Sequence, residues 1–77
     1  MKRVTIDEIS GECETVPLDS DFAWWGGTKH TWQQGNYTIH EIRADRGQLA
    51  IEVYGPSETT AKHLALGYFN AIIEARQ

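Results

Sequence analysis

Apolar and polar side chains alternate near the start of the chain, which is the pattern of a strand that buries one face. Val4 and Ile6 alternate there with Thr5 and Asp7. This alternation predicts a first strand over Arg3 to Ile9.

Further strands are predicted where β-branched and aromatic residues lie between turn-forming residues. Ser10 and Gly11 supply the first turn, and Pro17 ends the next segment because proline lacks a backbone donor. Gln34-Gly35-Asn36 supplies a later turn. Tyr37 to Arg43 and Gln48 to Tyr54 are predicted strands, and Thr28 to Gln33 leads into the first of them as part of a meander. Glu12 to Val16 could return as a further strand beside the first.

The last two strands are predicted to form a hairpin, because Asp45-Arg46-Gly47 suits a three-residue loop with glycine in the left-handed conformation. That loop would pair Ile39 with Val53 and divide the apolar residues between the two faces of the sheet. A two-residue loop would instead pair Ile42 with Ile51 and gather more apolar side chains on one face. The sequence leaves both registers open.

A helix is predicted from Glu58 to about Arg76, with Ser57 as its N-cap. One apolar stripe has the spacing of a helix that faces a core. It contains Ala61, Leu64, Ala65, Tyr68, Ile72 and Ala75. A second apolar strip contains Leu66, Phe69 and Ile73. Either the aromatic segment from Phe22 to Gly27 covers this strip, or the strip meets another chain and forms a dimer face.

These elements predict an α+β fold, in which a three- or four-stranded antiparallel sheet packs against one C-terminal helix. No repeat or linker divides the chain, so residues 1 to 77 are expected to form a single small domain.

Composition narrows the class of protein. The chain has 77 residues, one cysteine and a net charge of −4. One cysteine cannot form an internal disulfide, and no stretch is apolar enough for a secretory signal or a membrane span. A protein of the reducing cytoplasm, without membrane contact, is therefore expected.

The negative charge is concentrated in the N-terminal half. Every charged residue between Arg3 and Lys29 is acidic, namely Asp7, Glu8, Glu12, Glu14, Asp19 and Asp21. Such a segment repels nucleic acid and attracts basic protein surfaces. The neighbouring rings of Phe22, Trp24 and Trp25 are side chains of the kind that anchor protein interfaces. We therefore predict a protein-binding surface made of these nine residues, with no direct contact to nucleic acid.

No catalytic or metal motif is present. His30, His40, His63 and Cys13 lack the close ligand pairs of structural zinc sites, and His40 is expected opposite Glu52 on the next strand. The carboxylates beside Cys13 disfavour a reactive thiolate. We predict that the protein is not an enzyme and uses no metal or cofactor.

The segment from Gln48 to Ser57, followed by Thr60 to Ala65, resembles the last strand and helix of double-stranded-RNA-binding domains and of HicB-type antitoxins. The first family carries a basic cluster at the helix start, where this chain has Ser57-Glu58-Thr59-Thr60, so RNA binding is not implied.

Small size, the acidic N-terminal half, the aromatic segment and the sheet-plus-helix layout together resemble phage-encoded inhibitors of the anti-CRISPR type. This resemblance implies an inhibitor in the cytoplasm of a bacterial host, monomeric or homodimeric. It would dock on a basic nucleic-acid-binding surface of a nuclease or surveillance complex and block target binding. The alternative is a dimeric antitoxin-like or regulatory module that uses the broad apolar helix face.

Overall fold

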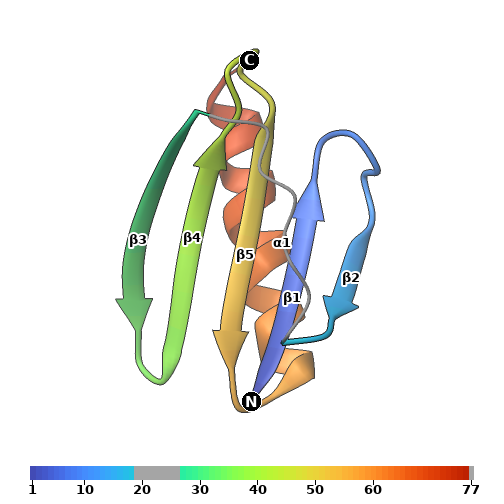
Figure 1. Ribbon diagram of the computed structural model, residues 1–77, viewed down its shortest axis with the longest axis vertical. Coiled ribbons are helices and arrows are strands. Elements are labelled where there is room, and N and C mark those ends of the chain that lie inside the picture. The colour runs from blue at the N-terminus through green and yellow to red at the C-terminus, as the bar shows by residue number, and fades with distance from the viewer. Residues whose placement is uncertain (19–26, 77) are drawn as a thin grey trace.

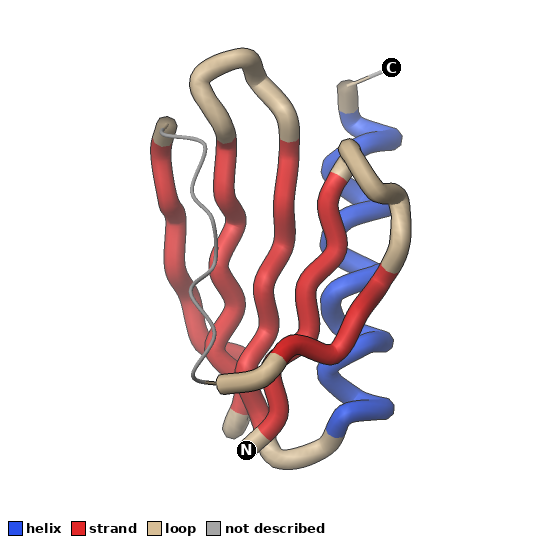
Figure 2. Tube along the Cα trace, turned by 45° about the vertical axis from the view of Figure 1, so that its right-hand side comes forward, coloured by secondary structure: helices blue, strands red, loops and turns tan. Residues whose placement is uncertain are grey.

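A computed structural model describes residues 1–18 and 27–76 of the chain. In this part of the chain five antiparallel strands form one sheet, and one helix covers a face of it (Figures 1 and 2). The strands are β1 (Lys2–Asp7), β2 (Cys13–Val16), β3 (Thr28–Gln34), β4 (Tyr37–Arg43) and β5 (Leu49–Gly55), and the helix is α1 (Glu58–Ala75). The predicted α+β class is confirmed, with five strands rather than three or four.

The order of strands across the sheet is β2-β1-β5-β4-β3. The first and last strands along the chain, β1 and β5, are therefore neighbours in the middle of the sheet. The consecutive strands β2 and β3 lie at its two opposite edges (Figure 1). Residues far apart in sequence thus build the centre, and among residues 1–18 and 27–76 each edge strand pairs with one other strand.

The β4–β5 hairpin has the three-residue loop. The Ala44 N–H donates to the Gln48 carbonyl at 2.9 Å, and Gly47 adopts a φ of +85°. Ile39 lies opposite Val53, which confirms the register set by that loop. The alternative pairing of Ile42 with Ile51 is wrong, because the two-residue loop that it requires does not form.

Two features make the sequence of α1 helical at its start. Ser57 is extended, and its hydroxyl accepts a hydrogen bond from the Thr60 N–H at 3.3 Å. Glu58 lies in the first turn, where a negative charge is favoured by the helix dipole. The predicted N-cap is confirmed, and the helix ends at Ala75, one residue before the predicted end.

Small residues let α1 approach the sheet closely. Ala61 and Ala65 are fully buried and belong to the main core. The helix packs mainly on β1 and β5. The buried sheet residues in this core alternate along three strands and are Val4, Ile6, Ile39, Leu49, Ile51 and Val53.

The sheet is also buried on the face turned away from α1. Strand alternation places Ile42 on this face, since it lies three residues after Ile39, which points to the helix. Ile42 is 1% exposed, and Ala50 opposite it is fully buried. Arg3 and Glu52 are buried on the same face. We call this surface the distal face.

Candidate functional site

The structure divides the predicted acidic surface into structural and available carboxylates. Asp7 belongs to the structural group, because its carboxylate accepts hydrogen bonds from the Ile9 and Ser10 N–H groups at 2.9 and 2.8 Å. This arrangement closes the turn after β1. Gly11 completes the turn with a φ of +71°. The first strand therefore ends at Asp7, two residues earlier than predicted.

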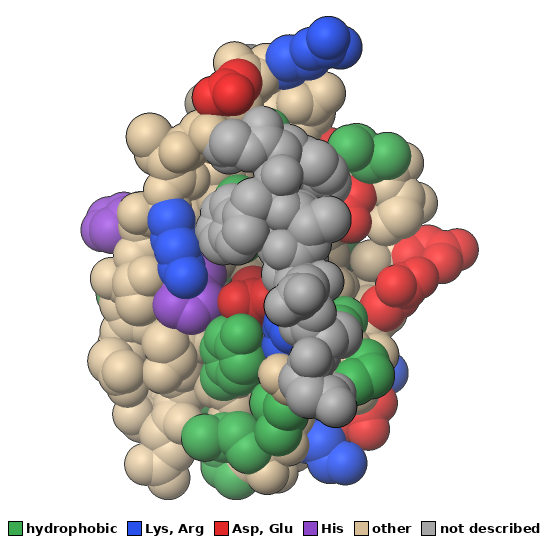
Figure 3. Space-filling model, viewed as in Figure 1, with side chains coloured by type: hydrophobic (Ala, Val, Ile, Leu, Met, Phe, Trp, Pro, Cys, Tyr) green, Lys and Arg blue, Asp and Glu red, His purple; other side chains and the backbone are tan. Residues whose placement is uncertain are grey.

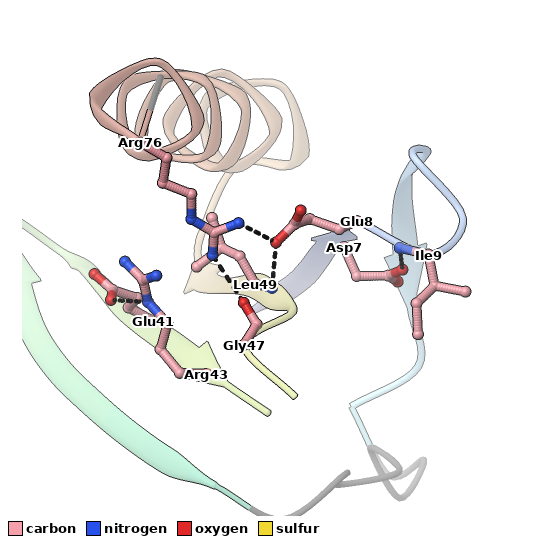
Figure 4. A network of polar contacts seen from close by, with 8 residues as sticks. All are labelled: Asp7, Glu8, Ile9, Glu41, Arg43, Gly47, Leu49 and Arg76. Atoms are coloured by element: carbon pink, nitrogen blue, oxygen red, sulfur yellow. Dashed lines mark hydrogen bonds and ion pairs between the residues drawn. The ribbon is translucent and has the colours of Figure 1, made fainter. Parts of the chain in front are cut away.

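Glu8 is the second structural carboxylate. It accepts hydrogen bonds from the Leu49 N–H at 2.6 Å and from Arg76 at 2.7 Å, while Arg76 also donates to the Gly47 carbonyl (Figure 4). The contact joins the end of β1 to the end of α1 and to the β4–β5 loop. Partial burial favours the neutral form of Glu8, but these two donors prevail and hold its pKa below the ordinary value of 4.5.

The lowered pKa of Glu8 gives stability a pH dependence of known sign. Because the pKa is lower in the folded state, the stabilisation is present above the unfolded value and is lost as pH falls through the folded value. Glu8→Gln should lower the free energy of unfolding near pH 7 by less than about 1 kcal/mol, since the pair is exposed. Its effect should be smaller near pH 2 than near pH 7. Urea unfolding at both pH values checks this, with the exposed Glu12→Gln as control.

Among the residues that the structure describes, Glu12 and Glu14 form the available part of the predicted acidic surface. Both are exposed, and neither side chain forms an ion pair within residues 1–18 and 27–76. Glu12 directly precedes β2, and Glu14 lies on β2 opposite Thr5. Most of the acidic side chains visible on the distal face lie on its β2 side (Figure 3). We call Glu12 and Glu14 the acidic edge.

The positive charges do not gather into a groove for nucleic acid. Four of the basic residues are held by carboxylates in ion pairs, namely Arg3, Arg43, Lys62 and Arg76. Lys2 begins β1, whereas Arg46 lies in the β4–β5 loop at the other end of the sheet (Figure 1). Lys and Arg side chains are accordingly scattered over the distal face (Figure 3).

A polar cluster lies on the distal face, and the sequence predicted only one of its contacts, that of His40 with Glu52. The Arg3 Nε donates to a Glu52 carboxylate oxygen at 2.9 Å, and both side chains are buried. The predicted pairing of His40 with Glu52 is confirmed, with 3.9 Å between His40 Nε2 and the other carboxylate oxygen. Tyr54 completes the cluster, since its ring contacts both Arg3 and His40.

The cluster contains a hydroxyl, an imidazole and a carboxylate, but their geometry does not suit nucleophilic catalysis. Thr31 Oγ1 lies 2.7 Å from His40 Nδ1, whereas the 3.9 Å from His40 to Glu52 exceeds a hydrogen bond. Glu52 is oriented by Arg3 instead. Burial, Lys29 and Arg3 lower the pKa of His40 against the opposing charge of Glu52. The arrangement is therefore one that stabilises a buried arginine.

The predicted dimer face on α1 is only partly exposed. Leu66 is 40% exposed, whereas Phe69 and Ile73 are half-buried and pack against the main core. A shallow groove lies between α1 and the end of β3. Its lining comes from both elements and comprises Gln34, His63, Leu64, Gly67, Tyr68 and Ala71.

Cys13 is half-buried, and burial raises the pKa of its thiol against the opposing influence of Lys62. The thiolate of Cys13 is disfavoured as predicted, but the cause is burial of the thiol and not the carboxylates beside it in sequence. In the described ranges, no three His, Cys, Asp or Glu side chains are grouped to hold a metal ion. No helix there is long and apolar enough to cross a membrane.

The other predicted interface residues lie outside the described part of the chain, and they are Asp19, Asp21, Phe22, Trp24 and Trp25. Comparison with protein-family models, curated proteins and solved structures finds no match to this chain.

Proposed function

We propose that the protein is a small protein-binding inhibitor of the anti-CRISPR type. The acidic edge would dock on a basic nucleic-acid-binding surface of a bacterial nuclease or surveillance complex and block target binding. The observation that carries the proposal is the pair of exposed carboxylates on the edge strand β2 and just before it, Glu14 and Glu12, which form no ion pair with another described residue.

The distribution of charged residues supports binding to a basic protein surface rather than to nucleic acid. Asp7 and Glu8 are used within the fold, so Glu12 and Glu14 are the described members of the predicted acidic surface that remain for a partner. Charged residues at the rim of an interface mainly accelerate association and set its salt dependence. Phosphate binding would require clustered Lys and Arg, and most of the basic residues here are already paired with carboxylates.

Charge reversal on the acidic edge tests the proposal. Glu14→Lys should weaken binding to the target complex by about tenfold or more and should reduce the salt dependence of the association rate. Glu74→Lys is the matched control, because Glu74 is exposed on α1 and makes no ion pair with another described residue. Its binding should equal that of the wild type.

The experiment is a plaque assay in bacterial strains that carry different CRISPR systems, each expressing the wild type, Glu14→Lys or Glu74→Lys. The wild type and Glu74→Lys should restore phage growth in at least one strain, and Glu14→Lys should not. Failure of the wild type in every strain, or equal activity of both variants, would contradict the proposal. Binding of the active pair is then measured with purified complex at low and moderate salt.

A further inference from the structure

The strand β3 forms the edge of the sheet farthest from the acidic edge, and its side chains are exposed except for the half-buried Trp32. It pairs with β4 along its whole length. No strand of residues 1–18 or 27–76 lies on its other side (Figure 1). A seven-residue edge of this kind is a ready template for another strand.

The β3–β4 turn decides which backbone groups of β3 face outward. Gly35 and Asn36 form a two-residue loop, with Gly35 at a φ of +59°. In such a hairpin the residues flanking the loop exchange hydrogen bonds, so Gln34 bonds to Tyr37. The backbone N–H and C=O groups of Gln34, and of every second residue before it in β3, then point to β4. The N–H and C=O groups of Thr31 and Gln33 consequently point to the open side of the edge.

The two edges of the sheet differ in how they are protected against pairing. At the other edge β2 has four residues and carries Glu14, with Glu12 just before it, and short length and charge are common protections. In contrast, β3 contains no Asp, Glu or Pro. Its one charged residue is Lys29, and its length and lack of Pro favour pairing with another strand.

We propose that two copies of the chain pair antiparallel through β3, with Thr31 of one copy opposite Thr31 of the other. A two-fold axis through this pair gives each copy the same contacts. The two Thr31 residues would exchange both backbone hydrogen bonds, because their N–H and C=O groups face outward. The sheet of each copy would continue into that of the other.

This register brings together compatible side chains. On the helix side, His30 lies opposite Trp32 of the second copy, and on the distal side Lys29 lies opposite Gln33 of the second copy. Threonine pairs and aromatic pairs stabilise neighbouring strands, and here no like charges are directly opposite. Within each chain Trp32 is already held by the rings of His30 and Tyr68, at centroid distances of 5.6 and 5.2 Å.

The pairing leaves the acidic edge accessible, since β2 lies at the opposite edge of the sheet. It is independent of the proposed inhibitor function. It also differs from a dimer through Leu66 on the helix, and substitutions can separate the two arrangements.

Analytical ultracentrifugation over a range of concentrations tests the proposal. The wild type should dimerise at high concentration, whereas Thr31→Lys and Thr31→Glu should each be monomeric because like charges meet at the two-fold axis. An equimolar mixture of the two variants should dimerise again. Thr31→Val is the control. It removes the hydroxyl contact to His40 but keeps an uncharged β-branched side chain, and it should dimerise like the wild type.

Circular dichroism of each variant verifies that it is folded. A monomeric wild type would overturn the proposal, as would dimers of both charged variants. Loss of the dimer in Leu66→Lys together with its retention in Thr31→Lys would place the contact on α1 and would also overturn it. Recovery of the dimer in the mixture supports this surface and this register, because only directly opposed residues compensate each other's charge.

Discussion

Replacing Glu52 with glutamine is expected to lower the free energy of unfolding by about 3 to 5 kcal/mol, because the substitution removes a carboxylate that is buried in an ion pair with the Arg3 guanidinium. Arg3 and Glu52 are each only 3% exposed, and 2.9 Å separate Arg3 Nε from the carboxylate. Glutamine preserves the shape and one acceptor oxygen but removes the charge. A loss of this size is a large part of the stability of a small domain.

Glu41→Gln is the matched control, because Glu41 pairs with Arg43 at 3.0 Å in a more exposed setting. This second substitution should cost no more than about 1 kcal/mol. Urea unfolding near pH 7 measures both variants. Equal losses for the two would contradict the argument, since they would show that burial of the Arg3–Glu52 pair adds nothing.

The same variant has a local spectroscopic readout. Burial already lowers the pKa of His40, and the negative charge of Glu52 acts in the opposite direction. Glu52→Gln should therefore lower the pKa of His40 further, which an NMR titration of its imidazole can follow in the folded fraction. An unchanged pKa would show that the 3.9 Å contact carries no electrostatic interaction.

The features that the sequence predicted correctly depend on local chemistry. Ser57 and Glu58 specify the start of α1 through the cap and the helix dipole. Gly47 specifies the β4–β5 loop through its left-handed conformation. In both cases the decisive atoms lie within four residues of one another, so the sequence alone contained the information.

The features that could not be predicted from the sequence depend on contacts between distant segments of the chain. Glu8 was predicted for a partner surface, but it is held by Arg76, which is 68 residues away. Glu12 and Glu14 look the same as Glu8 in a charge pattern. Only the order of strands, with β1 beside β5, brings Glu8 to the Leu49 N–H and leaves the acidic edge outside.

The three-residue loop already placed apolar residues on both faces of the sheet, but the burial of Glu52 was likewise not predictable from periodicity. β5 reads Leu-Ala-Ile-Glu-Val-Tyr-Gly, and all but Tyr54 are buried. An alternating pattern suggests that Glu52 faces solvent, since a charged residue is rarely buried. Glu52 is buried because Arg3 on the neighbouring strand compensates its charge, and that pairing requires the tertiary structure.

Ile42→Ala tests whether the distal face is a true second core, and we expect it to lower the free energy of unfolding by about 2 to 5 kcal/mol. Ile42 is 1% exposed and lies opposite Ala50, on the side of the sheet turned away from α1. Truncation removes buried methyl and methylene groups and leaves a cavity.

Two further alanine variants serve as the buried and the exposed comparison for this measurement. Ile39→Ala removes the same side chain from the helix-facing core, where burial is complete, and it should cost about as much as Ile42→Ala. Leu66→Ala removes an exposed side chain and should change the free energy of unfolding by no more than about 0.5 kcal/mol.

Urea unfolding of the three variants then distinguishes a sheet with one buried face from a sheet with two buried faces. In a sheet with one covered face, Ile42 would be hydrated in both the folded and unfolded states, so its truncation would resemble that of Leu66. If the distal face is a core, Ile42→Ala must lower the free energy of unfolding about as much as Ile39→Ala, because the same groups are removed from an equally buried site. A loss of unfolding free energy near that of Leu66→Ala would refute the second core. It would also contradict the burial of Arg3 and Glu52 on the same face.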